Sequence, residues 1–168
     1  MKGLRASFAL LALSCAAFFT YILVTASGMP ERVATHFGVN GVPNGWMTRN
    51  GLVTFSLIMG TLVPGFVVGM FALMRRKDGK GLNIPSKEYW LAPEHREETL
   101  SFVQRQGSWF AVLMVAFFAG VHHLIMSANQ RHPVGVTGSD ETWLIGMFLT
   151  AMTVWAVGFV GHFYRRPA

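Results

Sequence analysis

The chain has 168 residues, of which 52% are hydrophobic and 13% are charged. Its 14 basic residues outnumber its 8 acidic residues and give a formal net charge of +6. A chain this short and apolar leaves no room for a separate soluble catalytic domain. The net positive charge does not require a nucleic-acid partner, because the placement of the basic residues beside the apolar segments is typical of membrane insertion.

Four segments contain no Asp, Glu, Lys or Arg and are mostly apolar: residues 6–30, 50–74, 106–130 and 142–164. Roughly 20 helical residues cross a hydrocarbon core of about 30 Å, so each segment is long enough to span a bilayer. The first apolar run, residues 6–26, exceeds the roughly 7–15 apolar residues of a signal peptide, so we expect it to be retained as a span.

The sequence therefore predicts an all-α fold with a single membrane domain over residues 1–168. Its four transmembrane helices are expected over about 6–26, 51–74, 107–127 and 142–163. An ordered outer loop over 27–50, an interfacial amphipathic inner connection over 75–106 and a short outer loop over 128–141 join them.

The basic residues predict the orientation, because Lys and Arg near the ends of spans are retained on the cytoplasmic side. Eleven lie on one side of the predicted topology: Lys2, Arg5, Arg75, Arg76, Lys77, Lys80, Lys87, Arg96, Arg105, Arg165 and Arg166. The other side has three: Arg32, Arg49 and Arg131. We expect both termini and residues 75–106 in the cytoplasm, and the two outer loops outside.

Two pairs of small residues in the spans favour close helix packing. They are Gly65 with Gly69 in the second span and Ala116 with Gly120 in the third. Small residues four positions apart let helix backbones approach each other in lipid. Packing inside the bundle is the favoured interpretation, and a dimer face is the alternative.

The outer loop contains several turn-forming residues and one histidine. Pro30 can start a short helical turn, which would place Val33 and Phe37 on one side. The glycines and asparagines that follow predict a compact path back to the membrane, where Trp46 can lie at the headgroups. His36 either bonds this backbone or binds a metal or a proton.

The inner connection is expected to hold a helix that begins near Pro93 and continues into the third span, with a break at Gly107. Acidic residues just after Pro93 suit the first turn of a helix. Tyr89 and Trp90 fit a membrane interface. An amphipathic element on the inner leaflet is the favoured interpretation, and a docking surface for a cytoplasmic partner is the alternative.

Four histidines belong to the predicted outer side: His36, His122, His123 and His132. Three of them converging would make a zinc or copper site. His122 and His123 are adjacent on a helix and point about 100° apart, so they are poorly placed to serve one metal. As polar rings within a span, both are expected to face the bundle or water.

The sequence contains no recognisable catalytic constellation, since no acidic residue lies inside a span and no nucleophile elbow or phosphate-binding loop is present. A non-enzymatic protein is therefore favoured, although enzyme activity stays open. Two alternatives remain: a metal-binding protein or metalloenzyme that uses the outer histidines, and a small transporter or transporter accessory coupled through His122 or His123.

The outer loop also resembles a known family. The residues that carry the resemblance are Pro30, Val33, His36, Phe37, Gly41, Pro43, Asn44, Trp46 and Arg49. Together they are similar to bacterial domain-of-unknown-function family 1648, a membrane module found in SdpI-type toxin-immunity and signalling proteins. The chain has Met29 where the family carries leucine and Asn44 where it usually carries aspartate. An inner-loop signature of shorter members is similar to Asn83, Pro85, Tyr89, Trp90, Pro93, Arg96 and Glu97.

The resemblance implies a non-enzymatic protein of the bacterial inner membrane, with a role in toxin immunity, signalling or as an accessory protein. It implies that the outer-loop motif is a binding surface for a toxin, a peptide or a membrane protein. We expect the 168 residues to be too few to carry the SdpI domain as well.

Overall fold

The computed structural model describes residues 2–165. In chain order, its elements are α1 (Lys2–Ala26), β1 (Arg32–Phe37), β2 (Pro43–Thr48), α2 (Arg49–Arg76), α3 (Lys87–Trp90), α4 (Arg96–Gln130) and α5 (Gly138–Tyr164). The described residues contain four helices long and apolar enough to cross a membrane, namely α1, α2, α4 and α5. The predicted all-α, four-helix membrane fold is confirmed.

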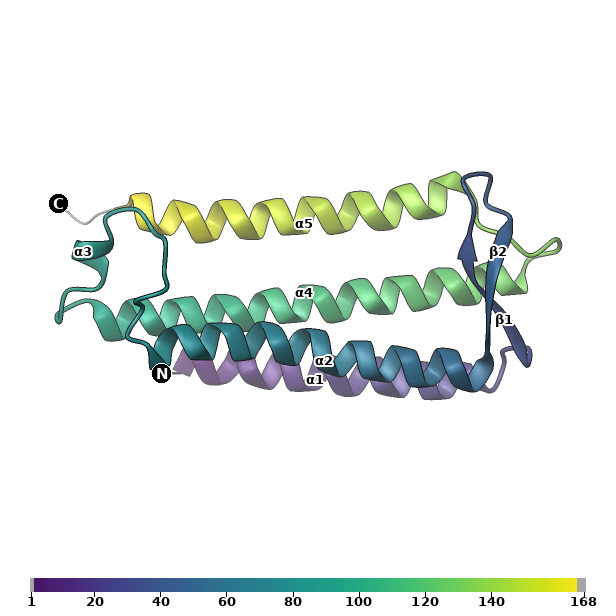
Figure 1. Cartoon of the computed structure of the whole chain (residues 1–168), viewed down its shortest axis with the longest axis horizontal. Helices are drawn as coiled ribbons and strands as arrows, with labels where there is room; N and C mark the ends of the chain where they lie inside the picture. The colour runs from purple at the N-terminus through teal and green to yellow at the C-terminus, as the bar shows by residue number, and fades with distance from the viewer. Residues whose placement is uncertain (1, 166–168) are drawn as a thin grey trace.

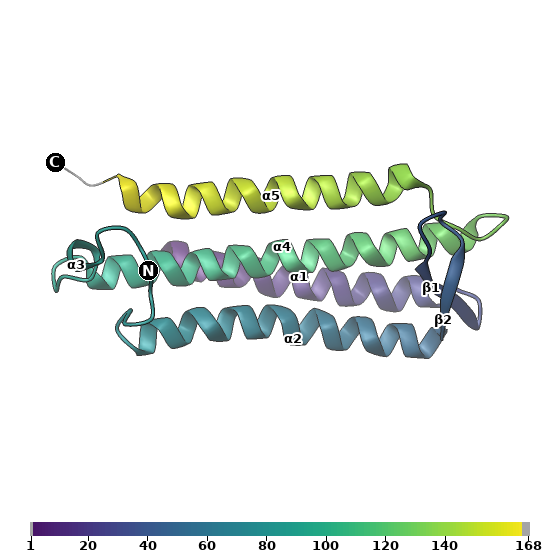
Figure 2. The same ribbon diagram turned by 45° about the horizontal axis from the view of Figure 1, so that its top comes forward.

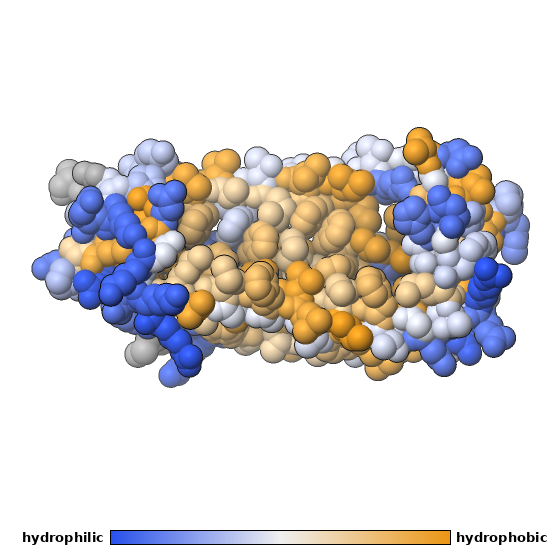
Figure 3. All heavy atoms as spheres, viewed as in Figure 1, coloured by the Kyte–Doolittle hydropathy of each residue, from blue (hydrophilic) through white to orange (hydrophobic). Residues whose placement is uncertain are grey.

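The molecule has two polar ends separated by an apolar band (Figure 3). The start of α1, the end of α5 and α3 lie at one end, here called the connection end, and the two strands lie at the other, here called the hairpin end (Figure 1). In the described part of α5, Phe163 alone is buried, and apolar side chains such as Val154 and Val157 are about two-thirds exposed. An exposed apolar band of this extent is the surface of a multi-pass membrane protein.

The four long helices are unequally packed. Helices α1, α2 and α4 lie together, whereas α5 runs beside α4 (Figures 1 and 2). The predicted pair of Ala116 and Gly120 serves this second contact, because a Cβ on Gly120 would lie 2.4 Å from Cδ1 of Leu144 on α5. Gly65 and Gly69 have no described neighbour within 4 Å of a Cβ position, so this pair is not used for packing inside the bundle.

The expected helical turn after Pro30 is wrong. Residues 32–37 form a strand that pairs antiparallel with β2, in a register that sets Val33 opposite Met47 and Ala34 opposite Trp46. Val33 and Ala34 are fully buried, so packing and backbone pairing outweigh the i, i+4 spacing of Val33 and Phe37. The hairpin leads directly into α2, because the Thr48 hydroxyl caps that helix by accepting from the Gly51 N–H at 3.0 Å.

Helix α4 also differs from the expectation, since it begins at Arg96 rather than near Pro93 and continues without a break through Gly107. At Gly107 a Cβ would lie 2.4 Å from the ring of Phe71, so this glycine lets α2 approach α4 closely. The glycine therefore serves helix packing rather than a hinge.

The connection end has its own apolar core. The core residues are Leu82, Ile84, Trp90, Leu100, Val103 and Phe163. The Trp90 indole Nε1–H donates to the backbone oxygen of Phe163 at 3.1 Å, in the last turn of α5 where carbonyls lack helical partners. The inner connection is thus packed against α4 and α5.

Candidate functional site at the hairpin end

One side chain of α4, that of Asn129, hydrogen-bonds the hairpin to this helix. The Asn129 Oδ1 atom accepts from the Ala34 N–H at 2.9 Å, and its Nδ2 donates to the Ala34 oxygen at 2.9 Å. The same Nδ2 donates to the Ile125 oxygen at 2.8 Å. Because Ala34 is fully buried, this amide provides hydrogen-bond partners that water cannot supply.

The tip of the hairpin is fastened to the loop between α4 and α5. The Val136 N–H donates to the Gly41 oxygen at 3.1 Å. Gly41 has φ of +75°, and a Cβ there would lie 2.2 Å from the Val136 oxygen, so glycine is required for both conformation and space. The hairpin therefore extends across the hairpin end from α2 toward the start of α5 (Figures 1 and 2).

The base of the hairpin is held by Arg49 and Arg32. The Arg49 guanidinium donates to the Met29 oxygen at 3.2 Å, and its backbone N–H donates to the Glu31 oxygen at 2.9 Å. The Arg32 guanidinium lies 5.4 Å from the centroid of the Trp46 ring, within the range of a cation–π contact. These contacts give Arg49 and Trp46 of the loop motif structural partners.

His36 and Asn44 of the motif form an exposed pair across the two strands. The His36 Nδ1 atom bonds Asn44 Oδ1. Since an amide oxygen only accepts, Nδ1 carries the ring proton in this pair. Asn44 thus supplies the acceptor that the aspartate of the resembling family would supply. A Cβ on Gly45 would lie 2.8 Å from the Cβ of His36, so the glycine leaves room for the His36 side chain beside the opposite strand.

The remaining motif residues shape the hairpin. Pro43 lies opposite Phe37 in the strand register, and Pro30 is exposed just before β1. Val39 and Val42, on either side of Gly41, are exposed at the tip, and Trp46 is 43% exposed. A rigid loop therefore presents apolar side chains to its surroundings.

His122 and His123 bond two different residues of α1. The His122 Nε2 atom lies 2.9 Å from the Thr25 hydroxyl, and the His123 Nδ1 atom lies 3.0 Å from the Tyr21 hydroxyl. The Tyr21 ring also lies edge-on to His122, with centroids 5.3 Å apart. His122 is 2% exposed, so a polar ring is enclosed within the membrane part of the bundle.

Three outer histidines that converged would have made a metal site, but the described residues show no such cluster. Within residues 2–165 no three His, Cys, Asp or Glu side chains are gathered to hold a metal ion. His36 bonds Asn44, His122 and His123 bond α1, and His132 is exposed in the loop after α4. The four rings lie apart because His36 is on β1, His122 and His123 are on different faces of α4, and His132 is in the loop after α4.

A groove lies between α4 and α5 at the hairpin end. It encloses about 370 Å³ and is lined by Gly120, His123, Leu124, Ser127, Arg131, Asp140, Trp143, Leu144 and Met147. Arg131 and Asp140 form an ion pair of 2.5 Å at its polar end. A second, apolar hollow of about 230 Å³ shares Leu144 and Met147 with it. The groove is thus polar near the hairpin and apolar toward the middle of the membrane.

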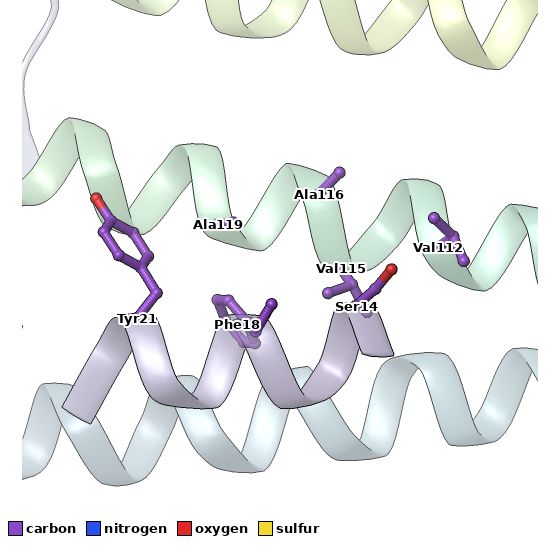
Figure 4. A pocket seen from close by; sticks show the side chains of 8 residues that line it. Ser14, Phe18, Tyr21, Val112, Val115, Ala116 and Ala119 are labelled. Atoms are coloured by element: carbon purple, nitrogen blue, oxygen red, sulfur yellow. The ribbon is translucent and has the colours of Figure 1, made fainter. Parts of the chain in front are cut away.

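A third hollow, of about 320 Å³, lies between α1 and α4 (Figure 4). Ser14, Phe18 and Tyr21 of α1 face small residues of α4, including Ala116 and Ala119 (Figure 4). The Ser14 hydroxyl donates back to the Leu10 oxygen at 2.9 Å. Tyr21 therefore provides the polar group at the end of this hollow nearer the hairpin.

The inner-loop signature lies at the connection end, far from the hairpin. Arg96 donates from Nε to the Leu91 oxygen at 3.1 Å, and Glu97 pairs with Arg75. Tyr89, Trp90 and Glu97 line a polar pocket of about 850 Å³. Asn83 and Pro93 are exposed, and Pro85 is half-buried. Most of these residues hold the connection in place.

Sequence reasoning missed Tyr21, Thr25 and Asn129. All three are polar side chains within or at the end of apolar helices, where such groups are costly without a partner. A polar residue in an apolar helix can therefore be recognised from the sequence as one that needs a hydrogen-bond partner, but the sequence does not identify that partner.

Residues 13–60 match the model of a protein family described as a domain of unknown function, DUF1648. This range covers the second half of α1, the whole hairpin and the first part of α2. No curated protein and no solved structure matches the chain. The family whose model matches residues 13–60 is thus the one that the hairpin motif of the sequence resembles.

Proposed function

We propose that this chain is a non-enzymatic protein of the bacterial inner membrane that binds a membrane-active peptide at its hairpin end. Its role would be that of SdpI-associated proteins, namely immunity to a toxin or signalling of its presence. The observation that carries the proposal is a hairpin fixed at three places that exposes apolar side chains at its tip.

The three attachments lie at Asn129, Val136 and Arg49. A loop that is already ordered loses little conformational entropy when it binds a partner. Val39 and Val42 are exposed at the tip, and exposed apolar residues on a rigid support are typical of interaction sites. These features favour a binding surface over a passive turn.

The groove between α4 and α5 supports a membrane-active partner. Its polar end, with Arg131 and Asp140, lies at the same end of the molecule as the hairpin, and its apolar part continues toward the membrane centre. An amphipathic peptide has a polar and an apolar face and would find a complement for each. A fully water-soluble ligand would leave the apolar part unused.

In this function the hairpin end would lie outside the cytoplasm. Eleven of the 14 basic residues belong to the termini and the inner connection, and this bias favours a cytoplasmic connection end. A partner that arrives from outside would then meet the hairpin first.

In vivo crosslinking tests the binding function. A photoreactive amino acid is placed at position 39 in the native host, and the matched control carries it at position 149, a 56% exposed leucine in the middle of α5. We expect a peptide or protein adduct at position 39 but lipid adducts alone at position 149. Equal adducts at both positions, or lipid alone at both, would contradict the proposal.

A growth assay tests the immunity role separately. A strain lacking the protein is challenged with conditioned medium from the parent strain and rescued with the wild type or with Val39→Asp. We expect wild-type rescue and loss of rescue by the variant at equal membrane abundance. Rescue by both would contradict a role for the hairpin tip.

A second candidate function is that of a proton-coupled transporter or of an accessory protein to such a transporter. The observation that favours it is His122, an ionisable ring enclosed among membrane helices. Substrate uptake in proteoliposomes that disappears with His122→Gln but persists with His132→Gln, a variant of the exposed loop histidine, would replace the first proposal.

A further inference from the structure

One nitrogen of the buried His122 ring has a partner and the other does not. The Nε2 atom is bonded to the Thr25 hydroxyl at 2.9 Å. The Nδ1 atom is buried and has no hydrogen-bond partner among the described residues. A buried polar atom without a partner destabilises the fold, so a group that bonds Nδ1 is expected there.

The hydrogen bonds of Thr25 assign the protons of the His122 ring. The Thr25 hydroxyl has one proton, and it donates that proton to the Tyr21 backbone oxygen at 2.7 Å. Toward His122 the hydroxyl oxygen therefore accepts, and Nε2 must carry a proton. In the neutral ring Nδ1 is then a bare acceptor, and it requires a hydrogen-bond donor.

His122 lines a small cavity between α1, α2 and α4. The centre of a water molecule can occupy a volume of about 40 Å³ in this cavity. One water molecule needs only about 10–15 Å³ of such volume. Ser56 of α2 provides the other polar side chain of the lining, and the rest is apolar: Phe18, Leu52, Phe55, Met59, Phe118, Val121 and Ile125. The space fits a small donor with two polar neighbours.

We propose that this cavity is a binding site for an ordered water molecule, which donates a hydrogen bond to His122 Nδ1 and bonds the Ser56 hydroxyl. A buried water needs at least two polar partners, and these two side chains supply them. The water completes a chain of hydrogen bonds from Thr25 on α1 through His122 on α4 to Ser56 on α2.

This chain of hydrogen bonds has a structural role independent of any partner of the hairpin. Thr25 and Ser56 both lie within the family domain, residues 13–60, whereas His122 lies outside it. The water-linked histidine therefore clamps the two helices of the domain onto α4 from inside the bundle. Asn129 does the same for the hairpin near the surface.

Nuclear magnetic resonance of the full chain in lipid nanodiscs tests the site. With ¹⁵N-labelled histidine, the wild type is expected to show a neutral His122 ring protonated at Nε2, with a hydrogen-bonded Nδ1 and a cross peak to slowly exchanging water. A ring protonated at Nδ1, or the absence of a water cross peak to His122, would overturn the proposal without any variant.

Two serine variants sharpen the test. Ser56→Ala is expected to lose most of the water cross peak, whereas Ser14→Ala, whose hydroxyl bonds the Leu10 oxygen on α1, is expected to keep it. Thr25→Val is expected to free Nε2 and shift its ¹⁵N resonance. An unchanged cross peak in Ser56→Ala would overturn the bridge to α2.

Discussion

Asn129 of α4 and Ala34 of β1, 95 positions apart in the chain, exchange two hydrogen bonds of 2.9 Å each. The side-chain amide thus takes the place of a neighbouring strand for one residue of the hairpin. This relationship joins the end of α4 to the segment that matches the family model and fixes which face of the hairpin lies on the bundle.

We expect Asn129→Leu to destabilise the protein. The substitution leaves the N–H and the oxygen of the buried Ala34 without this partner, at about 1–3 kcal/mol for each group. Thermal unfolding in detergent should show a lower midpoint. Asn40→Ala is the matched control, because Asn40 bonds only an exposed turn, and its midpoint should change little. Equal midpoints for the two variants would contradict the anchoring role.

We expect Gly41→Ala to loosen the hairpin tip. The new Cβ would meet the Val136 oxygen at 2.2 Å, and the positive φ of +75° is unfavourable for alanine. Hydrogen exchange should increase at residues 38–45 and 131–137 together, since the two segments bond each other. Gly81→Ala provides the control, because its Cβ position is open and its exchange should match the wild type.

We expect Trp90→Phe to weaken the connection end. The phenyl ring retains most of the apolar packing but loses the donor to the Phe163 oxygen, a cost of about 0.5–1.5 kcal/mol. Trypsin should then cut more readily within residues 75–105. Trp109→Phe, at a site 42% exposed on the membrane face, should leave the cleavage rate unchanged. Faster cleavage in both variants would indicate a general rather than a local effect.

Reporter fusions test the proposed orientation. We expect a reporter at position 40 to be active outside the cytoplasm and one at position 85 to be active inside it, because the basic residues favour a cytoplasmic connection end. Activity of both reporters in one compartment would contradict the four-span topology itself.

The spans were predictable because each is a long run of residues without charges, and the thickness of the bilayer sets a minimum length for a helix that crosses it. The start of α4 was predicted three residues early, since Pro93 and the acids after it suit a first turn, but the turn of residues 91–95 precedes the helix instead. Local chemistry identifies a helix start only to within a few residues.

The hairpin was not predictable from local spacing. Val33 and Phe37 satisfy the helical i, i+4 pattern, yet residues 32–37 form a strand paired with β2, and Ala34 finds further partners on Asn129, far along the chain. The positions of His122 and His123 were predicted in part, since the two rings separate, with His122 buried in the bundle and His123 exposed, and each bonds a different residue of α1. Their partners Thr25 and Tyr21 required the packing of α1 on α4.

Helix α5 buries less of its surface than the other spans, yet each of its ends is joined to a distant segment. Before its first turn, Val136 is bonded to the hairpin through Gly41, and in its last turn Phe163 is bonded to Trp90 of the inner connection. These two ties belong to opposite surfaces of the bilayer. Lateral escape of α5 into the lipid therefore requires both membrane surfaces of the protein to open, besides loss of the bond from the Trp155 Nε1–H to the Gln106 oxygen on α4.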